Sequence, residues 1–352
     1  MNHCVDLNKL LTIAVPTYAR AEKLLQLWRV MLKPLLELYP DTLEVFIQDN
    51  SASVESYPAT LLSGEFSTAK YVLNETNIGY HGNILALLRS ATSKYIWFWS
   101  DDDDYDYAVV SDLIGKLAEG VLSADLILPP FSYSRSKSYL SSNSYPSFDK
   151  LSSSILIAGG YAVRTDFESL LSAGCYPYVP LTSSLIIKID PRPREHILAA
   201  CRQNAWLHEV VMLSCANSST TVDLVYCKPF VYYEEMFDSH GQPLKSGMSI
   251  SYYHDNYIQL CQLRSAVFDD ESLFSEVGCW TGTLLWLLQQ KDKSINWSND
   301  ALAELKLSFF GLLMALKLRS NRLFLLSLAY ILLPSSAIRW LRRRRASRMP
   351  SH

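Results

Sequence analysis

Four consecutive aspartates, Asp101 to Asp104, follow the apolar run IWFWS at residues 96–100. Adjacent carboxylates repel one another, and no basic residue within this run compensates them. Carboxylate oxygens are ligands that suit Mg²⁺ or Mn²⁺, and such a cation would neutralise the repulsion and hold a diphosphate. The cluster therefore predicts a cation site or, as the alternative, a solvated acidic turn.

The residues around this cluster alternate between strand-like and helix-like patterns. Short apolar runs predict one strand in each of the segments 10–18, 43–53, 69–83 and 94–99. Apolar residues at helical spacing predict helices at residues 20–39, with a kink or break at Pro34, and at 84–92. Strands that alternate with helices indicate an α/β fold with a mostly parallel sheet.

The middle of the chain mixes both kinds of pattern. The runs at 181–190 and 224–236 predict one strand each, and residues 194–216 are broadly helical with one polar interruption. Between these halves, residues 132–154 are almost half serine, which predicts a mobile loop because such a segment cannot supply a packed core.

Polar residues follow each of the first four predicted strands. They are PTYAR at 16–20, DN at 49–50, NETNIGYHGN at 74–83 and SDDDD at 100–104. Ligands of open α/β sheets bind beyond the carboxyl ends of the strands. One polar strand end would be a loop, whereas four on one edge predict a binding site.

In their order and spacing these motifs resemble a family 2 glycosyltransferase with the GT-A fold, closest to the bacterial abequosyltransferase-like group. The resemblance is close over residues 11–110 and loose over 155–240. It implies an α/β, Rossmann-like catalytic domain at 1–245, which includes the serine-rich loop. A helical, membrane-associating region with a basic tail would follow at 246–352.

The resemblance also implies a donor site. Asp49 would accept hydrogen bonds from the base or ribose, and Asp101 and Asp103 would hold a divalent metal, with Asp102 as an alternative first ligand. Asp104 would be surface charge. The remaining residues that would line the nucleotide and its phosphates are Pro16, Thr17, Tyr18, Arg20, Asn77, Gly79 and Asn83. Ordinary turns remain the alternative for Asp49 and for the Asn/Gly stretch, and Ala19 departs from the asparagine common in the family.

An inverting transfer needs a carboxylate or imidazole that takes the proton of the acceptor hydroxyl. The family places an acidic pair at the start of a helix, where this chain has His208 and Glu209. Glu209 is the better match to the base, His208 is the second choice, and a surface pair is the alternative. His240 would join the metal or diphosphate, or be an ordinary loop histidine.

The C-terminal region combines apolar and basic segments. The apolar runs at 307–316 and 323–333 are shorter than the roughly 20 residues that span a bilayer. They predict helices of a subdomain or a segment in the membrane interface, with a membrane span or re-entrant hairpin as the third alternative. Residues 301–352 hold ten Lys/Arg and one acid, Glu304, which predicts contact with an anionic membrane surface. No nucleic-acid motif accompanies them, so no nucleic-acid partner is expected.

Composition is typical of a folded protein, with 49% hydrophobic and 19% charged residues. The seven cysteines contain no C-x-x-C pair, which favours reduced thiols in a cytosolic setting. Residues 1–10 include Asp6 and no long apolar run, so no secretory signal is expected.

The predicted protein is thus a cytoplasmic glycosyltransferase on the inner face of a bacterial membrane. As a hexosyl- or deoxyhexosyltransferase it would move a sugar from a nucleotide-diphosphate donor to a hydroxyl of a lipid-linked glycan, in lipopolysaccharide or other surface polysaccharide synthesis. Mn²⁺ or Mg²⁺ would assist, and inversion is what the resemblance implies. The alternatives are a nucleotidyltransferase, although PTYARAEK lacks the glycine-rich loop of that class, and a catalytically degenerate GT-A scaffold.

Overall fold

A computed structural model gives the structure of the chain. It describes residues 9–54, 58–132, 154–157, 161–172, 183, 185–189, 193–200, 207–217, 219–226 and 231–232, and a few positions after 257. The chain divides into two compact units, residues 1–235 and 236–352. The described positions of the second unit are all helical. Residues 133–153, most of the predicted loop, lie outside the described residues, as do most of 307–333.

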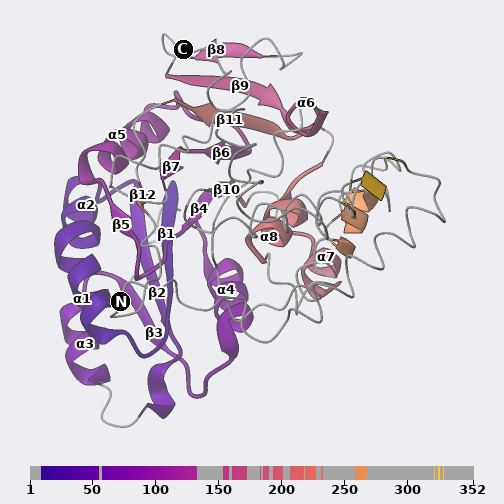
Figure 1. The fold of residues 1–352 in the computed structure, drawn as a ribbon. Coiled ribbons are helices and arrows are strands. Elements are labelled where there is room, and N and C mark those ends of the chain that lie inside the picture. Colours follow the sequence, from indigo (N-terminus) through magenta and orange to yellow (C-terminus); the bar gives the residue numbers. More distant parts are fainter. Residues whose placement is uncertain are drawn as a thin grey trace, which may run out of the picture. The chain divides into compact units, whose positions relative to one another are not determined.

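The first half of the main sheet is parallel, as predicted (Figure 1). It consists of β1 (Leu11–Thr17), β2 (Leu43–Asp49), β3 (Lys70–Leu73) and β4 (Tyr95–Phe98), in the order β3-β2-β1-β4. β1 and β4 are buried on both faces, which explains why their sequences read as continuous apolar runs. Parallel pairing brings the carboxyl ends of all four strands to one edge.

Helices cover both faces of this half-sheet. In Figure 1, α1 (Ala21–Leu27), α2 (Lys33–Leu38), α3 (Ala59–Glu65) and α5 (Tyr107–Ala118) lie on one side, and α4 (Gly79–Ser90) lies on the other. No break occurs at Pro34: α1, a π-helix η1 (Trp28–Leu32) and α2 follow one another without a gap from Ala21 to Leu38. The proline is the second residue of α2, directly after the wider π-helical turn.

The second half of the sheet is mixed. The order continues from β4 through β10 (Ile186–Lys188), β6 (Leu126–Leu128), β11 (Thr221–Val225), β9 (Ala162–Asp166) and β8 (Ile155–Ile157). β10 and β9 run antiparallel to their neighbours, while the other strands share one direction. Three short helices accompany these strands, α6 (Phe167–Ser172), α7 (Glu195–Ala200) and α8 (Leu207–Cys215).

A small second sheet lies next to the aspartate cluster. It joins β5 (Asp104–Tyr105), β12 (Val231–Tyr232) and β7 (Phe131–Ser132). The run at 224–236 is therefore not the single strand predicted, because β11 and β12 belong to different sheets. Pro229 stands between them, and a proline cannot donate to a continuous strand ladder.

An aromatic cluster holds the strand that leads into the aspartates. Trp97 and Trp99 are fully buried and meet edge to face with their ring centroids 5.2 Å apart. Trp99 also stacks on Tyr105, with a centroid distance of 4.0 Å. Trp97 donates from Nε1 to the Ser183 carbonyl at 2.6 Å. The loop between Trp99 and Tyr105 is thus fixed at both ends.

No helix within the described part of the chain is long and apolar enough to cross a membrane.

Candidate functional site

The candidate site lies at the edge where β1, β2, β3 and β4 end. Thr17 and Asp49 are the last residues of β1 and β2. The aspartate loop follows β4, and its start is tied to β1 by a 2.9 Å hydrogen bond from the Trp99 amide to the Ala14 carbonyl. Its far end enters β5 and then α5, where Asp106 caps the helix by accepting from the amides of Ala108 and Val109.

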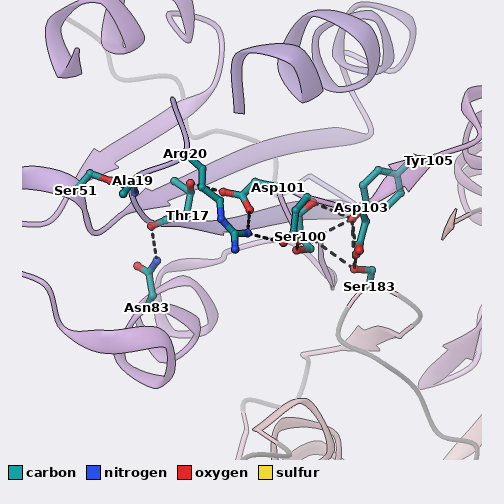
Figure 2. Close-up of polar contacts among 11 residues, drawn as sticks. Thr17, Ala19, Arg20, Ser51, Asn83, Ser100, Asp101, Asp103, Tyr105 and Ser183 are labelled. Carbon is teal, nitrogen blue, oxygen red and sulfur yellow. Dashed lines mark hydrogen bonds and ion pairs between the residues drawn. The ribbon is translucent and has the colours of Figure 1, made fainter. Parts of the chain in front are cut away.

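Asp101 accepts hydrogen bonds from two donors, one at the end of β1 and one in the loop that follows β1 (Figure 2). Thr17 donates from Oγ1 to Asp101 Oδ2 at 2.5 Å. Arg20 donates from Nη1 to Asp101 Oδ1 at 2.8 Å and to Asp102 Oδ2 at 2.7 Å. The positive charge that the aspartate run itself lacks is therefore supplied by Arg20.

Burial affects the pKa values of both Asp101 and Arg20. Asp101 has a side chain that is only 3% exposed, and burial raises its pKa while hydrogen bonds from Thr17 and Arg20 oppose that rise. Burial also disfavours the charge on Arg20, but its hydrogen bond and attraction to Asp101, helped by Asp102, raise its pKa overall. Each partner thus favours the charged form of the other.

Asp103 points to different partners. Its Oδ2 accepts from Ser183 Oγ at 2.7 Å and, more weakly, from the Tyr105 hydroxyl at 3.5 Å. Burial, reinforced by the charges of Asp102 and Asp101, raises the pKa of Asp103 to about 7 against the opposing Ser183 bond. The predicted metal pair Asp101 and Asp103 is brought into one loop, but the two carboxylates bind separate sets of donors. Asp104 is exposed.

Within the described residues, no group of three or more His, Cys, Asp or Glu side chains is arranged to hold a metal ion. Asp101 and Asp102 nevertheless converge, because both contact the same nitrogen of Arg20.

A network of side-chain amides joins the strand ends to α4. Asn74 donates from Nδ2 to Asn50 Oδ1 at 2.5 Å and to Asn83 Oδ1 at 3.2 Å. Asn83, which is 2% exposed, donates to the Gln48 carbonyl at 2.9 Å and more weakly to the Thr17 carbonyl at 3.4 Å. Asn50 donates to the Gly79 carbonyl at 3.1 Å. Asn83 therefore links α4 to the ends of β1 and β2.

Gly79 stands at the turn that leads into α4, in a backbone conformation that favours glycine. Asn77 Oδ1 accepts from the Gly79 amide at 2.9 Å, and Gly79 has a φ of +73°, a conformation that other residues adopt only with strain. The sequence motif at 74–83 thus forms a turn that is linked to the strand ends. The turn is therefore present, and the predicted role of this stretch as a wall of the donor site stays a prediction.

Asp49 is fully buried and engaged by protein donors. Its Oδ1 accepts from the Ser51 amide at 2.9 Å and from the Ser51 hydroxyl, and its Oδ2 accepts from the Tyr71 hydroxyl at 2.8 Å. The predicted contact with a base or ribose stays a prediction. Ser51 also accepts from the Ala19 amide at 2.8 Å, so it ties the loop after β1 to the loop after β2.

The loop after β1 presents Tyr18 at the surface, with 48% exposure, next to Ala19, whose φ is +58°. Pro16 lies half-buried within β1. Behind the aspartate loop is a cavity of about 280 Å³, lined by Lys23, Gln26, Leu27, Val30, Met31 and residues 101–105.

His208 and Glu209 lie at the start of α8, Leu207–Cys215. Their side chains, and all of His240, lie outside the described residues. Tyr71, Asn74, Ser183 and the pairing of Arg20 with the aspartates were not anticipated from the sequence. For Asn74 the signal was its place at the end of β3, whereas Ser183 carries no signal in its own segment.

The sequence of this chain matches the model of a known protein family. Residues 12–164, which span β1 to β9 and include the whole site edge, match the model of the family described as Glycosyl transferase family 2. The chain carries a family 2 glycosyltransferase domain. This match confirms the predicted family and enzyme class.

The fold of the glycosyltransferase is shared with a solved structure. The S. aureus TarS structure of residues 1–349 superposes with a TM-score of 0.50 at 11% identity, covering 91% of each chain, which confirms the predicted α/β class. The complex of TarS 1–349 with UDP-GlcNAc gives a TM-score of 0.48 at 12% identity, covering 83% of this chain and 75% of that one. No curated protein sequence matches this chain.

Proposed function

We propose that this glycosyltransferase moves a sugar from a nucleotide-diphosphate donor to a hydroxyl of a lipid-linked glycan. The observation that carries the donor half is the meeting of Thr17, Arg20, Asp101 and Asp102 at the carboxyl ends of β1 and β4. A guanidinium and paired carboxylates at this edge suit a diphosphate and its cation. Tyr18 and Pro16 would then line the part of the site that holds the nucleotide base of the donor.

The acidic residues fit a divalent cation. One oxygen of Asp101 and one of Asp102 lie 2.8 Å and 2.7 Å from the single nitrogen Nη1 of Arg20, so they converge on one position that favours positive charge. Mg²⁺ and Mn²⁺ are held in such enzymes by one or two carboxylates together with water and substrate phosphates. Asp101 and Asp102 would hold the ion, and Asp103 would join only by reorienting toward it, because its Oδ2 accepts from Ser183. His240, which lies outside the described residues, stays a predicted further ligand.

Such a cation would supply charge that stabilises the departing diphosphate. The other roles fall to this chain's own residues. Thr17 orients Asp101 through its hydroxyl. Glu209, or His208 in its place, would take the proton of the acceptor hydroxyl during an inverting attack on the anomeric carbon. The support for a general base here is the position of both residues at the start of α8.

The acceptor half of the proposal depends on the C-terminal sequence. Apolar runs at 307–316 and 323–333, followed by the basic cluster at 339–348, suit a segment that lies in an anionic membrane interface. Such a segment would place the enzyme on the cytoplasmic face, beside an acceptor that cannot leave the bilayer.

The donor half is tested by ligand-dependent thermal stabilisation of the full chain. The panel holds UDP-, GDP-, CDP- and dTDP-sugars, including UDP-GlcNAc, each with Mn²⁺, with Mg²⁺ or with EDTA. We expect one class of nucleotide to raise the melting temperature in a metal-dependent manner, because binding to the native state adds to its stability. Asp101→Asn should lose this shift, while Asp104→Asn, an exposed neighbour in the same loop, should keep it.

Absence of a shift with every nucleotide would argue against a donor site in this protein. A shift that survives Asp101→Asn would move the site away from the end of β4.

A further inference from the structure

One nitrogen of Arg20 contacts two carboxylates of the aspartate loop. The side chain of Arg20 is 45% exposed, yet a single nitrogen, Nη1, bridges the 3% exposed Asp101 and the 23% exposed Asp102. A guanidinium often pairs with a single carboxylate through two nitrogens. Here two carboxylates share one nitrogen, which is the arrangement that a small cation receives from its ligands.

The two carboxylates are oriented by groups other than Arg20. Asp101 uses Oδ2 for Thr17 and Oδ1 for Arg20, and Asp102 uses Oδ1 for Ser100 and Oδ2 for Arg20. Each carboxylate is therefore fixed by a neutral hydroxyl through one oxygen and presents the other to the shared position. Withdrawal of Arg20 would leave both oxygens aimed at the same point.

The start of α1 does not depend on the side chain of Arg20. Arg20 precedes the first residue of α1 and its side chain contributes no cap to that helix. The backbone at this turn is held instead by Ser51, which accepts from the Ala19 amide at 2.8 Å. A long exposed side chain on a fixed backbone exchanges between partners by rotation about its own bonds.

We propose that Arg20 is a displaceable internal cation: its guanidinium occupies the position between Asp101 and Asp102 until a divalent ion replaces it, and the freed guanidinium then pairs with the donor diphosphate. This rests on the proposed function of the site. Two cations cannot share the position, because both would need the same two oxygens and would repel each other strongly at that distance. Arg20 and the metal are therefore competitors before the donor binds and partners afterwards.

The exchange lowers the apparent affinity for metal of the donor-free enzyme. Only the fraction of molecules with Arg20 withdrawn accepts the ion, so the dissociation constant is raised by the reciprocal of that fraction. A diphosphate that attracts Arg20 increases this fraction and thereby tightens metal binding. By reciprocity the metal tightens diphosphate binding by the same factor.

Mn²⁺ binding to the full chain tests the exchange, measured from the electron paramagnetic resonance signal of the free ion, with and without UDP. We expect Arg20→Gln to bind Mn²⁺ about fivefold or more tightly than the wild type without nucleotide. UDP should tighten Mn²⁺ binding in the wild type and have a much smaller effect in Arg20→Gln. Arg29→Gln is the matched control, because Arg29 lies in η1, directly after α1, and pairs with Glu65 at 2.9 Å and not with an aspartate of the loop.

Arg20→Lys provides a second variant should the glutamine impair folding. A lysine keeps the charge but has a single flexible ammonium in place of the planar fork, so its Mn²⁺ affinity should fall between the other two. Equal affinities for Mn²⁺ in the wild type and both Arg20 variants would overturn the exchange and leave the proposed donor site intact. Failure of every variant to bind Mn²⁺ would also overturn it, and the nucleotide panel without metal would then decide separately whether the donor site stands.

Discussion

Thr17 at the end of β1 donates a 2.5 Å hydrogen bond to Asp101, 84 positions later in the chain. The contact is possible because β1 and β4 are parallel neighbours whose ends meet at one edge of the sheet. The geometry of the site is thus inherited from the register of two buried strands.

Replacing Thr17 with valine should destabilise the protein and weaken donor binding. Valine keeps the shape of the side chain but leaves a buried carboxylate short of one donor, which costs about 2 kcal/mol when the acceptor is charged. Urea unfolding measures the loss of stability, and thermal shift with nucleotide measures the loss of binding. Thr17→Ser retains the hydroxyl and should preserve most of both. A valine variant as stable as the serine variant would show that the bond contributes little.

Asp103 should make the metal-free protein less stable as the pH rises from about 4 to about 7. Its pKa is raised by burial to about 7 in the folded state, while the ordinary value is 3.8. In that interval the folded state retains a proton that the unfolded state has released, so stability falls with increasing pH. Asp103→Asn removes this titration and should therefore melt higher than the wild type at pH 8, with the difference shrinking toward pH 5.

Melting curves in EDTA at several pH values provide the measurement for Asp103, with Asp104→Asn as the control for a lost charge in the same loop. If both asparagine variants changed the pH profile alike, general repulsion within the cluster would be responsible.

Replacing Ala19 with asparagine should stabilise the protein. The φ of Ala19, +58°, lies in the left-handed region, which costs an ordinary residue about 1 kcal/mol and which asparagine tolerates better. The side chain is exposed, so the substitution disturbs no packing. We expect Ala19→Asn to raise the urea midpoint at constant m-value and Ala19→Val to lower it. The opposite order would mean that the backbone of this loop differs in solution.

Glu209→Gln should lower kcat by about a hundredfold or more while leaving donor binding unchanged, as expected for loss of a general base. His208→Gln should have the smaller effect. Initial rates at saturating donor, together with the nucleotide thermal shift, separate the chemical step from binding. A reversed order of the two variants would assign the base to His208.

The basic tail should control binding to anionic membranes. Replacing the four arginines at 342–345 with glutamine should weaken binding to vesicles containing phosphatidylglycerol by more than about tenfold, since each basic residue contributes about 1 kcal/mol near such a surface. Binding to neutral vesicles should change little. Sedimentation of the full chain with both kinds of vesicle at low and moderate salt gives the comparison, and unchanged binding to the anionic vesicles would remove the tail from the membrane proposal.

The elements of the parallel half-sheet were predictable because each carries its own signal. β1 and β4 are buried on both faces and appear in the sequence as unbroken apolar runs, and polar motifs mark where the strands end. The family match over residues 12–164 agrees with the motifs recognised there. Local periodicity was sufficient because these strands pair in a regular parallel arrangement.

The contacts of individual site residues were not predictable in the same way. Arg20 and Asp101 are 81 positions apart, and nothing in either segment specifies that they form a pair. Ser183 reaches Asp103 from a region whose strand, β10, is antiparallel to its neighbours and only three residues long. Such pairings depend on how distant segments pack together, which short-range patterns do not encode.

The strand order of the main sheet also constrains the sequence of events during synthesis. β10 lies between β4 and β6, although it follows β6 in the chain by about sixty residues. A nascent chain that has emerged through β6 therefore has an unpaired edge on β4 that must wait for residues 186–188, and long-range pairing of this kind is slow and prone to aggregation. Ser183 and β12, which hold the far side of the aspartate loop, also come late. The ribosome thus releases β1 to β4 and the aspartate loop well before the segments that hold the far side of this loop.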